Sequence, residues 1–157
     1  MRSRTSAGLV MYRFKDGGLQ IFLAHPGGPF FTHKDDGHWT IPKGEIEGEE
    51  DYLRTALREF QEEVGIALDP QGQFLDLGSI RQKGGKTVYA WGIERDWDDR
   101  RPFRSSTFKM QWPPGSGKLQ EFPEVDRAKF FPIEEARKKI KETQLPLLDR
   151  LEVLLNR

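Results

Sequence analysis

Residues 44–66 of this chain read GEIEGEEDYLRTALREFQEEVGI, and this stretch is the most informative one about the fold. Apolar side chains recur in it at three- and four-residue spacing, at Leu53, Ala56, Leu57, Phe60 and Val64. That period is typical of an α-helix that buries one face. We therefore predict a helix over residues 50–64, ended by Gly65 because glycine readily adopts the left-handed conformation found just after helices.

The predicted helix also carries a cluster of acidic residues. Glu59, Glu62 and Glu63 are three and four positions apart, so their side chains project side by side. Like charges at this spacing repel by roughly 0.2–0.5 kcal/mol per pair in an exposed helix. A bound divalent cation would reverse the sign, and carboxylate oxygens favour Mg²⁺ or Mn²⁺ over softer metals. The alternative is a solvated acidic face, which the surrounding pattern argues against.

The complete pattern resembles the signature of the Nudix hydrolases, G-x5-E-x7-R-E-U-x-E-E-x-G-U, where U is a bulky apolar residue. Every fixed position is satisfied, and Phe60 is aromatic where an aliphatic residue is more usual. The resemblance implies an α/β fold, the Nudix α/β/α sandwich with a mixed sheet, in a single domain over residues 1–157. It also implies a metal-dependent hydrolase that cleaves a pyrophosphate linkage in a nucleoside diphosphate derivative.

The same resemblance assigns roles to individual residues. The implied ligands of Mg²⁺, or of Mn²⁺, are the Gly44 carbonyl group and the carboxylates of Glu59, Glu62, Glu63 and, further along the chain, Glu124. The implied catalytic group comprises Glu59, Glu62, Arg58 and Glu50. Glu59 is the first candidate to orient or deprotonate the attacking water, although that role stays open among the glutamates. Arg58 and Glu50 are expected to hold the ligands and the entry to the helix.

Substrate recognition is expected to come from residues outside the signature. The approach to it, His38-Trp39-Thr40-Ile41-Pro42-Lys43, resembles that of asymmetrical dinucleoside tetraphosphate hydrolases, as does Lys86-Thr87-Val88 followed by aromatic residues. This likeness implies phosphate contacts from Lys43 and Lys86 and substrate contacts from Tyr89, Trp91 and His38. The sequence departs from that group at Ala90, where a base-stacking tyrosine is usual. Alternation along a strand would send Tyr89 and Trp91 to the other face.

Three interpretations of function remain open at this stage. The first is hydrolysis of a dinucleoside polyphosphate or a nucleoside triphosphate. The second is the same chemistry on nucleotide sugars or RNA 5′ ends. The third is a non-catalytic nucleotide-binding module, but such modules usually lose signature carboxylates and none is missing here. RNA is disfavoured because Lys plus Arg and Asp plus Glu both number 25, and extended RNA contact needs a basic surface.

Composition sets wider limits on the chain. Its 157 residues suit one domain with a real core, and the absence of cysteine excludes thiolate metal sites and cysteine nucleophiles. No apolar run is long enough to cross a membrane, and the first residues lead into no signal-peptide core. A cytoplasmic protein with a small nucleotide substrate, and no membrane partner, is expected. The oligomeric state stays open.

The remaining sequence predicts hairpins, a further strand and two helices. Strands are expected over residues 6–14 and 19–24, 74–81 and 86–94, and 128–131, with turns at Asp16-Gly17-Gly18 and Gly84-Gly85. Helices are expected over residues 133–140 and in the C-terminal segment, where Pro146 is expected in the first turn. Residues 25–37 are expected to form a loop, with His25, His33 and His38 as ordinary loop or surface residues. Residues 96–118 are predicted to be a flap or a base-recognition segment.

Overall fold

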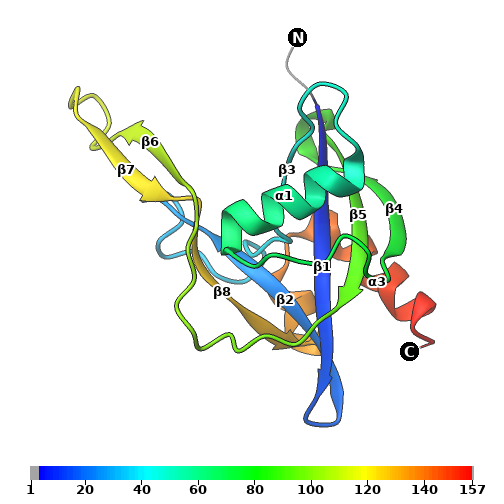
Figure 1. Cartoon of the computed structure of the whole chain (residues 1–157). Helices are drawn as coiled ribbons and strands as arrows, with labels where there is room; N and C mark the ends of the chain where they lie inside the picture. Colours follow the sequence, from blue (N-terminus) through cyan, green and yellow to red (C-terminus); the bar gives the residue numbers. More distant parts are fainter. Residues whose placement is uncertain (1–3, 157) are drawn as a thin grey trace.

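The computed structural model describes residues 4–156. Within that part of the chain, the main sheet has six strands in the order β4-β5-β1-β2-β8, with β3 paired to β1 (Figure 1). Their bounds are Thr5–Lys15 for β1, Gly18–Pro26 for β2, Lys43–Glu45 for β3, Leu75–Arg81 for β4, Thr87–Glu94 for β5 and Val125–Pro132 for β8. Strand β1 runs parallel to β5 and antiparallel to β2 and β3. The predicted mixed sheet is confirmed.

Both predicted hairpins are present. Strands β1 and β2 are joined by Asp16 and Gly17, whose φ angles of 54° and 79° give a turn that matches the twist of the strands. Strands β4 and β5 are joined through η1 (Lys83–Gly85), where Gly84 and Gly85 also have positive φ. The turn residues recognised in the sequence therefore occupy the tight bends.

The helices lie on opposite faces of the sheet (Figure 1). Helix α1 (Tyr52–Val64) packs over β1, and α2 (Ile133–Lys139) and α3 (Leu145–Leu154) cover the other face. Alternate residues of β1 divide between two cores, with Leu9 and Met11 under α1 and Val10 and Tyr12 under α3. The fold is the α/β/α sandwich that the resemblance implied.

Helix α1 begins two residues later than predicted. The Asp51 carboxylate accepts a hydrogen bond from the backbone N–H of Arg54 at 3.1 Å, so Asp51 is the N-cap and the helix starts at Tyr52. Gly65 ends it with a φ of 72° and donates its N–H to the Gln61 carbonyl group. Glu50 consequently lies outside the helix, from where its side chain reaches back to it.

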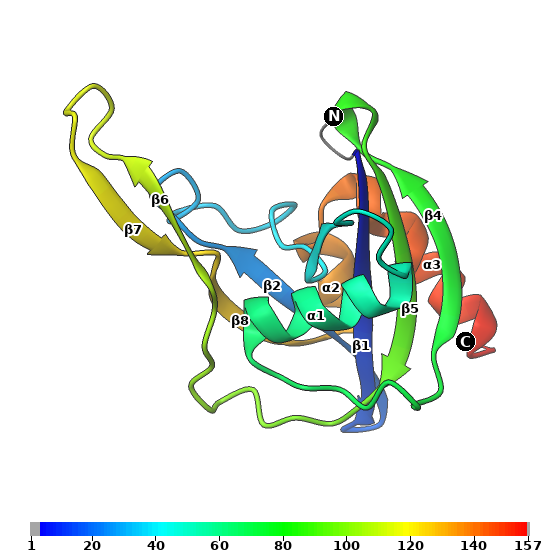
Figure 2. The ribbon, with the colours of Figure 1, turned by 45° about the horizontal axis from the view of Figure 1, so that its top comes forward.

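A separate hairpin projects from the body of the molecule (Figures 1 and 2). It consists of β6 (Thr107–Gln111) and β7 (Leu119–Pro123), and we call it the arm. The Phe108 ring covers Gly28, and Phe30 contacts Trp112 edge to face at 5.4 Å between ring centroids. The sequence did not predict these strands, because most of their residues are exposed and the apolar alternation is weak.

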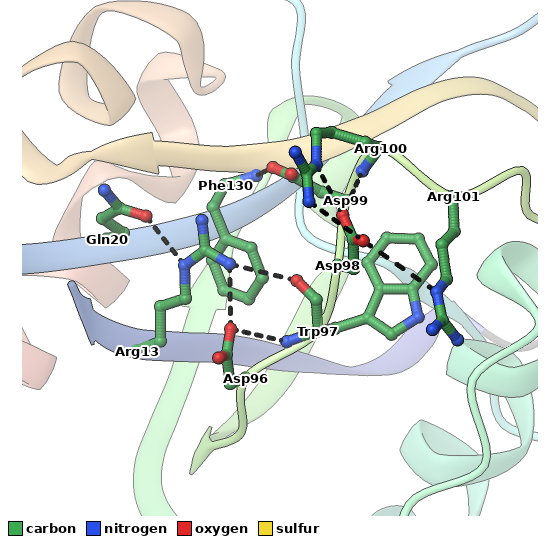
Figure 3. Close-up of polar contacts among 9 residues, drawn as sticks. All are labelled: Arg13, Gln20, Asp96, Trp97, Asp98, Asp99, Arg100, Arg101 and Phe130. Atoms are coloured by element: carbon green, nitrogen blue, oxygen red, sulfur yellow. Dashed lines mark hydrogen bonds and ion pairs between the residues drawn. The ribbon is translucent and has the colours of Figure 1, made fainter.

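The connection from β5 to the arm, residues 95–106, is held at both ends, and we call it the strap. Arg13 donates to Asp96 and to the Trp97 carbonyl group at 2.9 and 3.0 Å, and its guanidinium lies over the Phe130 ring (Figure 3). The Asp99 carboxylate accepts the Phe130 N–H at 2.8 Å. The first part of the strap therefore lies along β8, the last strand of the sheet, and the chain then continues into the arm.

His25 is not the exposed loop residue that the sequence suggested. It lies in β2 and is fully buried. Its ring nitrogens each lie 2.7 Å from an oxygen, Nδ1 from Asp126 Oδ1 and Nε2 from the Lys34 carbonyl. The side chain thus fastens the loop after β2 to β8, a structural role that loop composition concealed. No helix among residues 4–156 has the length and apolar character needed to cross a membrane.

Candidate active site

Arg58 contacts one carboxylate that precedes α1 and two carboxylates in the second half of that helix. It donates to both oxygens of Glu50, at 3.1 and 3.0 Å, to Glu59 at 2.9 Å and to Glu62 at 3.2 Å. Buried Thr55, which the sequence did not single out, donates its hydroxyl to Glu50 at 2.6 Å. The hydrogen bonds from Arg58 and then Thr55 hold the pKa of Glu50 below its ordinary value. Glu50 is therefore a fixed anion that orients Arg58.

The Glu59 side chain of α1 packs directly against the backbone of β3. A Cβ atom at Gly44 would be 2.0 Å from the carboxyl carbon of Glu59, so only glycine leaves room for this carboxylate. Strand β3 is itself fixed by pairing of Gly44 with Ala7 of β1. Burial, followed by the charge of Glu62, raises the pKa of Glu59 although Arg58 opposes the shift. Gly44 and Glu59 are thus brought together as predicted.

Glu63 is the most strongly perturbed carboxyl group of the site. Its Oε2 accepts the backbone N–H of Lys43 at 3.3 Å. Burial, followed by the charge of Glu59, raises the pKa of Glu63 to about 8. The charge of Glu124 adds to this effect, so Glu124 faces the same region. Burial also raises the pKa of Glu124 itself.

Glu124 reaches the site through the root of the arm. The Ser106 N–H donates to the Glu62 carbonyl at 2.7 Å, and the Glu124 N–H donates to the Ser106 carbonyl at 2.8 Å. The Ser105 hydroxyl also accepts the Val125 N–H at 2.9 Å. These bonds tie the segment that carries Glu124 to the carboxyl-terminal end of α1. The resemblance implied that Glu124 lies near the carboxylates of the helix, and backbone hydrogen bonds hold it there.

The donor set fits a hard divalent cation. Glu59 and Glu63 are desolvated carboxyl groups that repel one another, and a cation would relieve both costs. Their present partners are Arg58 and the Lys43 N–H, and within residues 4–156 no three acidic or histidine side chains converge tightly enough to enclose an ion.

Lysine side chains lie beside the carboxylates. Lys43 is largely withdrawn from solvent; burial lowers its pKa, as does the charge of Lys141. Lys86, at the tip between β4 and β5, lies 3.9 Å from Glu45 of β3. Lys141 was not predicted from the sequence, because it is almost a hundred residues from Lys43 and nothing in its local pattern marks it. The charges of Lys141 and Lys86 both act on Lys43, so the three cations form one electrostatic group.

The predicted aromatic contacts lie on the α1 face of the sheet. Tyr89 packs against Tyr52 of α1 with ring centroids 4.9 Å apart, and Trp91 packs against the core under that helix. Val88 and Ala90 point into the opposite core, as strand alternation required. His38 precedes buried Trp39 and its ring donates to the Asp36 carbonyl at 3.0 Å. Contacts of Tyr89, Trp91 and His38 with substrate stay predictions.

A cleft of about 630 Å³ opens elsewhere, between the strap and β8. Its lining includes Arg100, Arg101 and Phe103 of the strap and Arg127 and Lys129 of β8. None of the metal-ligand or phosphate-contact residues predicted above lines it. The cleft does, however, include Pro123 and Val125, the chain neighbours of Glu124.

Comparison with known proteins agrees with this geometry. Bis(5′-nucleosyl)-tetraphosphatase [asymmetrical] of Rattus norvegicus is 42% identical over 66 residues, which cover 39% of this chain and 45% of the relative. The Sus scrofa protein of the same name gives the same figures. These matches span less than half of each relative.

Solved structures share the fold over almost the whole chain. A C. elegans Ap4A hydrolase in a binary complex has a TM-score of 0.68 at 24% identity and covers 96% of this chain and 98% of its own. The NUDIX domain of Shewanella oneidensis NrtR, complexed with ADP ribose, has a TM-score of 0.67 at 16% identity and covers 99% and 90%. The family model of the NUDIX domain matches residues 2–151, and the chain belongs to the NUDIX family.

Proposed function

We propose that this protein is a metal-dependent pyrophosphohydrolase whose substrate is a dinucleoside polyphosphate or a nucleoside triphosphate. The observation that carries the proposal is the position of the Glu59 carboxylate against the backbone of Gly44. Half-buried Glu63 accepts the backbone N–H of Lys43, the residue before Gly44. Anionic ligands and cations thus lie together, as a phosphate chain and its metal ions require. The similarity to asymmetrical bis(5′-nucleosyl)-tetraphosphatases supports the dinucleotide class.

The proposed metal is Mg²⁺, with Mn²⁺ as a substitute, because all candidate ligands are oxygens. The metal would be held by Gly44, Glu59, Glu62, Glu63 and Glu124. When bound, it would neutralise the phosphate charge and lower the pKa of water. Arg58 and Glu50 keep the Glu59 and Glu62 side chains near this position before any ion arrives.

The remaining steps belong to the side chains. Lys43 and Lys86 hold the phosphate chain beside the carboxylates, where Lys43 is largely withdrawn from solvent. Glu59 orients the water and receives its proton as the oxygen attacks phosphorus. The bond from that phosphorus to the bridging oxygen breaks, and the leaving group departs as a nucleotide or, from a nucleoside triphosphate, as phosphate or pyrophosphate.

A substrate panel tests the proposal. Dinucleoside tri- and tetraphosphates, nucleoside triphosphates, nucleotide sugars and a 5′-triphosphorylated RNA would each be incubated with Mg²⁺ or Mn²⁺ in H₂¹⁸O. Products resolved by chromatography and mass spectrometry identify the cleaved bond and the labelled phosphate. We expect asymmetrical cleavage of a dinucleotide, abolished by chelation. Tight nucleotide binding without turnover on the whole panel would instead identify a non-catalytic module and end the proposal.

A further inference from the structure

Gln144 is a fully buried polar side chain outside the acidic cluster. Its Oε1 accepts the Ile41 N–H at 3.0 Å. Its Nε2 donates to the Thr40 hydroxyl oxygen at 2.9 Å and to Gln82 Oε1 at 3.0 Å. Because a backbone N–H can only donate, the Ile41 contact fixes the orientation of the amide. The side chain is therefore held by three bonds from two other segments.

Those two segments carry the candidate phosphate contacts. Thr40 and Ile41 lead directly into Lys43 and β3. Gln82 precedes η1, and its N–H donates to the Lys86 carbonyl at 2.8 Å. Gln144 thus connects the backbone that leads to Lys43 with the turn that ends at Lys86. In the chain it is 62 residues from Gln82 and 103 residues from Ile41.

The surrounding backbone makes this bridge stiff. Gln144 ends η2 (Glu142–Gln144), and its N–H donates to the Lys141 carbonyl at 2.9 Å. The segment before it pairs with the approach to β3: Trp39 donates its N–H to the Lys139 carbonyl at 2.9 Å, and Lys141 donates its N–H to the Trp39 carbonyl at 2.8 Å. The bridge therefore starts from a backbone that is itself fastened to the site, and it brings Lys141 towards Lys43.

We propose that Gln144 is a positioning residue that sets the spacing between Lys43 and Lys86 and so the fit of the phosphate chain. This inference rests on the proposed function, in which both lysines contact phosphates. Gln144 itself touches no reacting group. Loss of its amide would leave the lysines present but free to move relative to each other, so substrate binding would suffer more than the chemical step.

Two matched substitutions test the bridge. Gln144→Met keeps the length of the side chain and removes all three bonds, and Gln82→Met removes the single bond to the tip from a half-buried position. We expect each to raise KM for a dinucleoside tetraphosphate by roughly threefold to tenfold, the loss of about one hydrogen bond, with a much smaller change in kcat. The double variant should be no worse than Gln144→Met alone, since both break the same contact.

The control separates positioning from general destabilisation. Leu148 of α3 is fully buried and belongs to the core next to this segment. Leu148→Ala should lower the melting temperature at least as much as Gln144→Met while leaving KM unchanged. Equal KM increases in Leu148→Ala and Gln144→Met, or an unchanged KM in Gln82→Met, would overturn the proposal.

A second measurement does not depend on turnover. In the intact protein, hydrogen exchange should show faster exchange at residues 82–87 in Gln144→Met than in the wild type, while residues 5–15 of β1 keep their protection. Unchanged exchange at this tip would refute the bridge even if the enzyme is active. If the wild type hydrolyses no nucleotide, the proposed function fails, and the exchange result still decides whether Gln144 positions the tip.

Discussion

The carboxyl group of Glu59 lies against the backbone of Gly44, where an added Cβ would be 2.0 Å from the Glu59 carboxyl carbon. The contact joins α1 to β3 at the place where the candidate ligands meet. Arg58 holds the same carboxylate from the other side at 2.9 Å. The glycine of the signature therefore does more than relieve a turn, because it leaves the space that Glu59 occupies.

Gly44→Ala should displace the Glu59 side chain and lower kcat/KM by about a hundredfold or more, since small misplacements of reacting groups have costs of that order. The fold should persist because β3 can keep its pairing with β1. Gly18→Ala is the control, because a Cβ there meets no atom within 4 Å. Steady-state kinetics and circular dichroism of both variants check the expectation, and normal activity in Gly44→Ala would contradict the placement of Glu59.

Glu62→Gln and Glu63→Gln should each remove turnover while the protein remains folded. Each substitution keeps the shape of the side chain and deletes a charge that a cation needs. Kinetics over a Mg²⁺ titration, together with calorimetric binding of Mn²⁺, would measure the effect. Near-wild-type rates in both variants would refute the assignment of these glutamates.

The metal-free protein should lose stability as the pH rises from about 4.5 to about 8. The pKa of Glu63 is raised to about 8 from an ordinary value of 4.5, mainly by burial, so across this window the folded state keeps a proton that the unfolded state has released. The state with more bound protons is stabilised at low pH, and this contribution fades towards pH 8. Thermal melts in EDTA across the window measure it.

The matched variant for that experiment is Glu63→Gln, which has no proton to lose. Its melting temperature should fall less between pH 5 and pH 8 than that of the wild type. Added Mg²⁺ should restore wild-type stability at pH 8 by binding the folded state. A wild-type curve parallel to that of the variant would show that Glu63 titrates normally.

Lys86→Ala should raise KM for polyphosphate substrates by roughly tenfold, with little change in kcat, if its ammonium group contacts the phosphate chain. Lys129→Ala, on β8 beside the strap cleft, is a charge-matched control and should have no effect. The dependence on phosphate number is the informative measurement. An unchanged kcat/KM across dinucleotides with three to six phosphates would remove Lys86 from the site.

Much of the candidate site was predictable from local spacing. Helix α1, its glycine C-cap and the contacts of Arg58 with Glu50, Glu59 and Glu62 all lie within the signature. These residues are at most eight positions apart, so the helix and the turn that leads into it bring them together. The hairpin turns were predictable for a similar reason, since glycine marks positive φ. The arm strands were not, because two solvated faces leave little apolar alternation.

The sequence by itself determined the family resemblance, the acidic cluster and the helix that presents it, since each follows from spacing along a short stretch. Only the tertiary structure decided that Glu59 crosses Gly44, that Lys141 lies beside Lys43 and that Gln144 ties both lysine-bearing segments together. It also buried His25, which composition placed in a loop. These contacts join residues far apart in the chain, and chain folding around the central sheet, rather than any local pattern, brings them together.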